Sequence, residues 1–148
     1  MKDKTFLDTN IFIYSIDSSP DQSEKRNTAR RLVREHIKNE TGVISIQVLQ
    51  DFFQVATRKM EVPLTAEEAL EFLNYIGILE TVQPDFYFVV LSIRLHQSYG
   101  FSFWDSLILQ AAKTAGCSQI LSEDLQHGFK VDSLLIRNPF IAQATYPL

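Results

Sequence analysis

The sequence predicts an α/β fold, with a central parallel sheet of four or five short strands between two layers of helices (α/β/α). Short apolar segments alternate along the chain with longer segments in which apolar residues recur every three or four positions. The first pattern is typical of buried strands and the second of amphipathic helices. Strands that alternate with helices favour a parallel sheet, because each parallel connection must cross back over the sheet.

The predicted strands are short, apolar and followed by turn residues or by the start of a helix. The segment 78–82 alternates apolar and polar residues, and the segment 119–121 runs into Ser122-Glu123-Asp124. Both features are typical of strands. In chain order, strands are predicted at residues 4–8, 43–44, 78–82, 119–121 and 134–136.

Start and stop residues bound the predicted helices. Ser19-Pro20-Asp21 combines a Ser cap with a proline at the first helical position. Thr65-Ala66-Glu67-Glu68 is a capping box, Ser102-Phe103-Trp104-Asp105 resembles a second one, and Gly100 and Gly116 stop helices. In chain order, helices are predicted at residues 10–16, 19–39, 46–60, 65–76, 86–99 and 102–115.

The length of 148 residues is typical of one domain, so residues 1–148 are expected to fold as a single unit. The longest purely apolar run, Phe86 to Leu91, is too short to cross a bilayer, so no membrane partner is expected. The N-terminal residues lack the apolar region of a signal peptide. The single cysteine, Cys117, cannot form an internal disulfide, which fits a reducing, cytoplasmic location.

The charge balance directs attention to a few acidic residues. The chain has 14 basic and 18 acidic residues, a net charge of −4, which argues against a protein that coats nucleic acid. Four acids in similar settings account for the whole excess, since 18 minus 4 equals the 14 basic residues. They are Asp8, Asp51, Asp105 and Asp124.

The predicted fold brings at least three of these acids together. Asp8 ends the first strand, Asp124 follows the strand at 119–121, and Asp51 lies in the helix that leaves the second strand. In a parallel sheet the carboxyl ends of all strands lie along one edge, so these three side chains are expected to converge there. Asp105 follows a break between two helices, and the predicted order of strands and helices does not show whether it lies at this edge.

Converging carboxylates predict a site for a hard divalent cation. Neighbouring carboxylates repel and raise each other's pKa, and Mg²⁺ or Mn²⁺ removes that cost because these ions prefer oxygen ligands. Such an ion activates water and neutralises a phosphate, which favours phosphodiester chemistry. Taken singly, Asp105, Asp124 and Asp51 have ordinary explanations as a first-turn, a turn and a solvated helix residue. Asp8 is harder to explain by such an ordinary structural role, because the predicted strand around it is buried.

A basic stripe is predicted on the helix at 19–39. Arg26, Arg30 and Arg34 follow one another at a spacing of four residues, so they share a helix face. The stripe has two readings of equal weight: a contact for the phosphates of a nucleic acid or for a partner protein, and a solvated face paired with neighbouring glutamates.

Two further features are given structural roles. The aromatic residues Phe52, Phe53, Phe86, Tyr87, Phe88 and Trp104 are predicted to belong to the core, since they lie on apolar helix faces. His127, three residues past Asp124, is interpreted as a turn residue beside a glycine, with substrate contact or acid catalysis as the alternative.

Four segments together resemble PIN domains, and the chain is similar to VapC-type toxins of bacterial toxin–antitoxin pairs. The resemblance covers residues 4 to about 140 and implies the PIN-like α/β/α fold. The segments match in order and spacing and are Phe6-Leu7-Asp8-Thr9-Asn10, residues 44–52, residues 102–108 and residues 120–124.

The resemblance implies that Asp8, Asp105 and Asp124 hold the metal, with Asp51 as a fourth catalytic acid. The family usually has Glu where this chain has Asp51, so direct ligation by this shorter side chain is left open. Asn10 and Ser122 match residues that support the site, and Thr9 is expected to be a turn and supporting residue. The implied activity is Mg²⁺- or Mn²⁺-dependent endoribonuclease cleavage, in which metal-activated water attacks the phosphorus. A homodimer and a cognate antitoxin are the implied protein partners.

Two other functions remain as alternatives. One is a PIN-fold RNA- or protein-binding module with weak or lost catalysis, although the four acids argue against it. The other is a phosphatase that forms an aspartyl-phosphate at Asp8. Such enzymes have a second acid two residues later, and here that position is Asn10.

Overall fold

A computed structural model describes residues 2–141. These residues fold into six strands and six α-helices, with one short 3₁₀ segment at Pro20–Gln22 before the second helix. In chain order the elements are β1 (Thr5–Leu7), α1 (Thr9–Ile16), α2 (Ser23–Lys38), β2 (Gly42–Ser45), α3 (Ile46–Arg58), α4 (Ala66–Ile76), β3 (Glu80–Val82), α5 (Phe86–Tyr99), α6 (Phe103–Thr114), β4 (Gln119–Leu121), β5 (Lys130–Val131) and β6 (Leu134–Arg137).

The strands form one sheet in the order β3-β2-β1-β4-β6-β5. The first five are parallel, and β1 lies at the centre, with Phe6 opposite Val43 on one side and Ile120 on the other. The carboxyl ends of β1, β2 and β4 therefore lie side by side. This arrangement confirms the predicted parallel α/β sheet.

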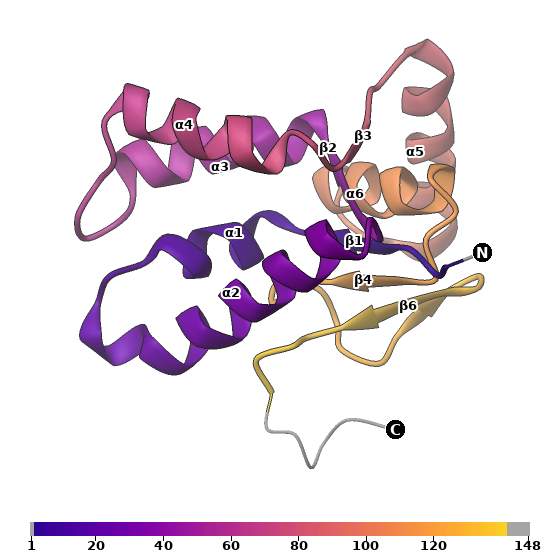
Figure 1. The fold of residues 1–148 in the computed structure, drawn as a ribbon. Coiled ribbons are helices and arrows are strands. Elements are labelled where there is room, and N and C mark those ends of the chain that lie inside the picture. The colour runs from indigo at the N-terminus through magenta and orange to yellow at the C-terminus, as the bar shows by residue number, and fades with distance from the viewer. Residues whose placement is uncertain (1, 142–148) are drawn as a thin grey trace.

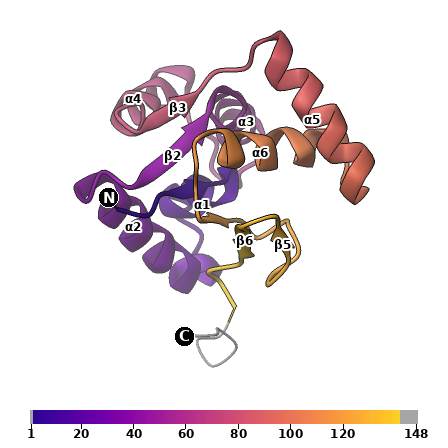
Figure 2. The same ribbon diagram turned by 90° about the vertical axis from the view of Figure 1, so that its right-hand side faces the viewer.

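Helices cover both faces of the sheet (Figures 1 and 2). Helix α2 lies against β2 on one face, and α6 contacts β2 and β4 on the other. Helices α5 and α6 pack against each other, as do α1 and α2. No helix within residues 2–141 is long and apolar enough to cross a membrane.

The sheet is larger than predicted at one end. The five parallel strands agree with the predicted four or five, and β5, which pairs antiparallel with β6, adds a two-residue strand at the edge that was not predicted. The two strands are joined through Asp132, whose φ of 54° lies in the left-handed region that Asp tolerates better than most residues. The predicted Ser19 cap is wrong, since no side-chain hydrogen bond caps the 3₁₀ segment.

The core is one cluster of apolar side chains centred on the sheet and the inner faces of the helices. Phe6, Ile44, Phe52 and Ile120 are fully buried within it. The prediction that all six aromatic residues belong to this core is wrong. Phe52 and Phe88 are buried, whereas the remaining four are exposed and are Phe53, Phe86, Tyr87 and Trp104. The helical period identified their faces as apolar, but no other element within residues 2–141 covers those faces.

Candidate acidic metal site

Asp8 occupies the point where the central strand ends and the first helix begins. Its side chain is 8% exposed. Asp8 is also the N-cap of α1, and its Oδ1 accepts a hydrogen bond from the Thr9 backbone N–H at 2.8 Å. Its Oδ2 accepts one from the Ser122 hydroxyl at 2.7 Å. These two bonds fix both oxygens of a carboxylate that packing has removed from bulk water.

The loop after β4 is tied to α1 by polar side chains. Ser122 is fully buried, and its Oγ also accepts from the Asp124 backbone N–H at 3.2 Å. The Asn10 amide donates to Asp124 Oδ2 at 3.2 Å and accepts from the Glu123 backbone N–H at 3.3 Å. Asn10 and Ser122 therefore hold Asp124 beside Asp8, and their role in supporting a metal site stays a prediction.

Asp105 reaches the same edge of the sheet because helix α6 begins there, directly after the turn that follows α5. Strand β4 is parallel to β1, so the preceding helix must end at the amino edge of the sheet and begin at its carboxyl edge. Asp105 lies in the first turn of that helix, and its N–H donates to the Ser102 cap at 3.1 Å. The direction of β4 thus determines the position of Asp105, which the predicted order of helices and strands did not determine.

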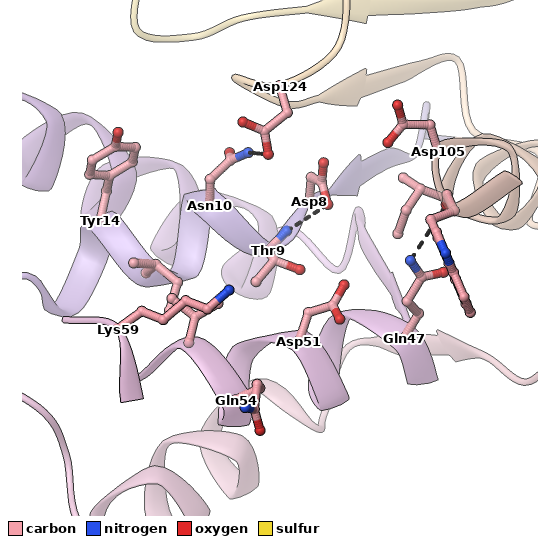
Figure 3. Close-up of a pocket in the computed structure, with 14 residues that line it drawn as sticks. Asp8, Thr9, Asn10, Tyr14, Gln47, Asp51, Gln54, Lys59, Asp105 and Asp124 are labelled. Atoms are coloured by element: carbon pink, nitrogen blue, oxygen red, sulfur yellow. Dashed lines mark hydrogen bonds between the residues drawn. The ribbon is translucent and has the colours of Figure 1, made fainter. Parts of the chain in front are cut away.

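The four acids line one pocket of about 500 Å³, which confirms the predicted convergence of Asp8, Asp51 and Asp124 and adds Asp105 to them. Asp8, Asp105 and Asp124 come from the sheet edge, and Asp51 reaches toward them from α3 (Figure 3). Thr9 and Asn10 also line the pocket. The Thr9 hydroxyl is buried and has no hydrogen-bond partner among residues 2–141, so it is a polar atom available to a ligand.

Burial dominates the electrostatics of the site. The pKa of Asp8 is raised from 3.8 to about 6, mainly by burial. The hydrogen bonds from Ser122 and Thr9 lower this pKa, and the charges of Asp124 and Asp105 raise it. Burial also raises the pKa of Asp51, while a hydrogen bond with Gln47 and the charge of Lys59 lower it. A cation among these groups would relieve the cost of ionising Asp8.

The donor set fits a hard divalent cation by its chemistry. All four acids offer carboxylate oxygens, which Mg²⁺ and Mn²⁺ prefer to nitrogen or sulfur. Within residues 2–141, no three His, Cys, Asp or Glu side chains stand close enough together, as oriented, to hold one ion. Ligation therefore requires side-chain rotation. Asp105 and Asp124 are less buried than Asp8 and can make that adjustment.

The predicted basic stripe does not reach this pocket. The Arg26 guanidinium donates to the carbonyl of Asp17 at 2.8 Å, and Arg30 Nε donates to the carbonyl of Ser15 at 2.8 Å. Both groups therefore anchor the carboxyl end of α1 to α2. Arg30 and Arg34 border a separate cavity beside Phe72. Contact of the stripe with RNA or with an antitoxin stays a prediction.

Lys59 is a pocket residue that the sequence analysis did not single out. It follows α3 and lines the pocket together with Asp51 and Val55. The spacing of four residues from 51 to 55 and from 55 to 59 places these side chains on one helix face, so the helical period could have identified it. Figure 3 shows Lys59 at the opposite end of the pocket from Gln47.

A second polar cluster borders the pocket at Tyr14. Glu123 accepts hydrogen bonds from the Tyr14 hydroxyl and from Lys25 Nζ, both at 2.6 Å. Lys25 Nζ also lies 4.7 Å from the centre of the Tyr14 ring. Because Glu123 neighbours Asp124, this cluster fastens the acidic loop to α2. The His127 ring accepts a hydrogen bond from the Asn138 backbone N–H at 3.0 Å, so it helps to hold the residue that follows β6.

Comparison with known proteins gives a family and several similar folds. A model of the PIN domain family matches residues 5–130. No curated protein matches the chain.

Several solved structures share the fold. The structure of a toxin–antitoxin complex from Klebsiella pneumoniae has a TM-score of 0.65 at 14% identity and covers 93% of this chain and 98% of that chain. A DNA-bound VapBC from Salmonella typhimurium has a TM-score of 0.65 at 18% identity, with coverage of 93% and 99%. VapC20 of Mycobacterium tuberculosis, a Sarcin-Ricin loop cleaving toxin, has a TM-score of 0.62 at 16% identity, with coverage of 82% and 92%. At these identities the likeness shows a shared fold.

The buried Asp8 predicts a pH-dependent gain in stability for Asp8→Asn in metal-free protein. Folded Asp8 holds its proton up to about pH 6, whereas an unfolded Asp releases it near pH 3.8. Ionisation of Asp8 therefore makes folding less favourable as the pH rises between these values, by up to about 3 kcal/mol. Asn carries no such charge, so the variant is expected to be more stable than wild type above about pH 6 and to lose that advantage below pH 3.8.

Urea unfolding of both proteins in a chelator, across this pH range, measures the difference. Carboxyl groups that do not interact with Asp8 titrate alike in both proteins and cancel. A difference in unfolding free energy that stays constant with pH would contradict the account of Asp8.

Proposed function

This chain belongs to the PIN domain family, and we propose that it is a Mg²⁺- or Mn²⁺-dependent endoribonuclease that acts as the toxin of a type II toxin–antitoxin pair. The observation that carries the proposal is the buried Asp8 carboxylate at the base of a pocket lined by three other acids. Such an arrangement costs stability unless it serves a ligand, and a divalent cation is the ligand that suits it.

In this proposal Asp8, Asp105 and Asp124 hold the cation, and Asp51 contributes as a fourth acid. When bound, the cation supplies charge for the scissile phosphate and lowers the pKa of an attacking water. Ser122 and Asn10 keep Asp8 and Asp124 in place through their hydrogen bonds. Lys59, at one end of the pocket, attracts the phosphate backbone of the RNA into an otherwise acidic site.

The partners of this chain follow from the same proposal. Similar folds occur in toxin–antitoxin complexes, among them VapBC and FitAcB, and in one protein described as a Sarcin-Ricin loop cleaving toxin. We therefore include a cognate antitoxin, a homodimer and a cytoplasmic location in the proposal, with residues 1–148 as one PIN-like domain. The single core cluster supports that last point.

RNA cleavage by purified protein with Mn²⁺ tests the function directly. Asp8→Asn removes one charge from the site and is expected to lower cleavage by roughly a hundredfold or more, because loss of a metal ligand removes several kcal/mol of stabilisation. Asp21→Asn makes the same chemical change at an exposed residue outside the pocket and should leave the rate unchanged.

Cleavage that survives Asp8→Asn would overturn the proposed site. If neither wild type nor variant cleaves RNA or binds Mn²⁺, the binding-module alternative takes its place.

The role of Lys59 predicts a salt effect. Lys59→Gln removes one phosphate contact, so the slope of log affinity against log salt concentration should fall by about 1. The matched control is Arg58→Gln, which removes the same charge from the adjacent exposed residue that does not line the pocket. Binding of single-stranded RNA to the Asp8→Asn protein measures both slopes. Equal slopes for Lys59→Gln and Arg58→Gln would refute a specific contact.

The short side chain of Asp51 predicts opposite effects for two substitutions. Asp51→Glu brings the carboxylate about one methylene closer to the other acids and should tighten Mn²⁺ binding. Asp51→Asn removes the charge and should weaken it roughly tenfold. Titration calorimetry with Mn²⁺ measures both. Weaker binding in both variants would show that the present length of Asp51, rather than its charge alone, fits the ion.

A further inference from the structure

A second pocket, of about 370 Å³, lies beside the acidic pocket and has a different character. Apolar side chains from β3, α5 and α6 form most of its wall, among them Val82, Phe88 and Leu107. Gln47 and Trp104 line both pockets, so the two spaces adjoin across these two residues. A strand bound at the acids therefore has the apolar pocket directly beside it.

Trp104 marks the boundary between the two pockets. Its side chain is 65% exposed, which is unusual for an apolar ring of this size. It precedes Asp105 in the first turn of α6, so the position of the ring is fixed relative to a proposed metal ligand. The Phe103 ring meets it edge-on with centroids 5.4 Å apart, and Gln47 Nε2 donates to the Trp104 carbonyl at 3.4 Å. These contacts hold the residue in place and leave its ring open to a ligand.

We propose that Trp104 and the apolar pocket bind an unpaired nucleobase of the RNA strand, next to the phosphate held at the acids. The inference rests on the proposed ribonuclease function and assigns a substrate-binding residue to the same site. The base stacks on the Trp104 ring, and its polar edge meets the side-chain amides of Gln47 and Gln50, which line this pocket. An amide group offers both a donor and an acceptor, which suits the edge of a base.

The charge of the protein favours this kind of contact. The chain carries a net charge of −4 and the scissile phosphate must enter a pocket with four carboxylates. Lys59 lines that pocket, while Arg26 and Arg30 are engaged with backbone carbonyls elsewhere. Attraction between opposite charges is therefore a small source of affinity. Stacking on an aromatic ring supplies affinity without charge and accepts any base.

Exposed apolar residues on α5 make a protein partner the competing occupant. Phe86, Tyr87 and Ile93 are exposed there and lie outside the apolar pocket, whereas the exposed Val89 lines it. The pocket adjoins the acidic pocket, since Gln47 and Trp104 line both. The closeness of the two pockets therefore favours the substrate strand.

The chain contains one tryptophan, so its fluorescence reports on Trp104 alone. The first experiment titrates the Asp8→Asn protein, which leaves RNA uncut, with a mixed-sequence single-stranded RNA oligonucleotide. Stacking is expected to quench the emission as the RNA binds. The same strand annealed to its complement should quench it much less, because its bases are already stacked and paired.

Two results of this titration would overturn the inference. One is binding of labelled single-stranded RNA, seen by anisotropy, without quenching. The other is a blue shift of the emission that grows with protein concentration in the absence of RNA, which would show that a second copy of the chain covers the ring.

The second experiment compares cleavage kinetics of variants. Trp104→Ala should raise KM for single-stranded RNA roughly tenfold or more and leave kcat nearly unchanged, while Trp104→Phe, which keeps a ring, should restore most of the loss. Tyr87→Ala is the matched control, since Tyr87 is 66% exposed and lines neither pocket. Thermal unfolding verifies that each variant is folded. Because stacking carries no charge, Trp104→Ala should leave the salt slope of binding unchanged, in contrast to Lys59→Gln.

The outcomes separate the two proposals. Wild type that cleaves RNA, together with Trp104→Ala that keeps the wild-type KM, overturns the nucleobase site and leaves the ribonuclease function standing. Wild type that neither cleaves nor binds RNA overturns both.

Discussion

The buried carboxylate of Asp8 is the constraint on which the site depends. It ends the central strand, caps the first helix and receives hydrogen bonds from the Thr9 backbone and the Ser122 hydroxyl. Those bonds only partly offset the loss of water, so the pKa of Asp8 rises to about 6. A group held in this way makes the metal-free fold less stable at neutral pH. The cost is explained if the carboxylate serves a cation.

The parallel sheet explains how distant acids reach this point. With β1 between β2 and β4, the carboxyl ends of three neighbouring strands deliver Asp8, Asp124 and the start of α3 to one edge. The need to return the chain to the amino end of β4 brings the start of α6, and Asp105, to the same edge. The fold thus brings residues as far apart in sequence as Asp8 and Asp124 into one set of oxygen ligands, and the hydrogen bond from the Asn10 amide holds Asp124.

The sequence predicted much of this arrangement because the strands, caps and acids follow simple patterns. Asp105 was left unplaced, although the direction of the next strand determines where its helix must begin. Strand β5 was missed because two residues joined to β6 through Asp132 carry a weaker hairpin signal than an Asn-Gly turn. Trp104 was assigned to the core because helical periodicity shows that a face is apolar without showing whether another element covers it. Arg26 and Arg30 were predicted to form a basic stripe because of their spacing, but their guanidinium groups donate hydrogen bonds to nearby backbone carbonyls.

The position of a bound metal ion is the most direct test of this account. Crystals of the protein grown with Mn²⁺ would locate the ion by its anomalous scattering. The account predicts an anomalous peak within bonding distance of Asp8, Asp105 and Asp124, with the last two side chains rotated toward it, and it leaves Asp51 to bind directly or through water. Absence of a peak in this pocket at a saturating Mn²⁺ concentration, or a peak elsewhere with Asp8 still bound only to Ser122 and Thr9, would contradict it.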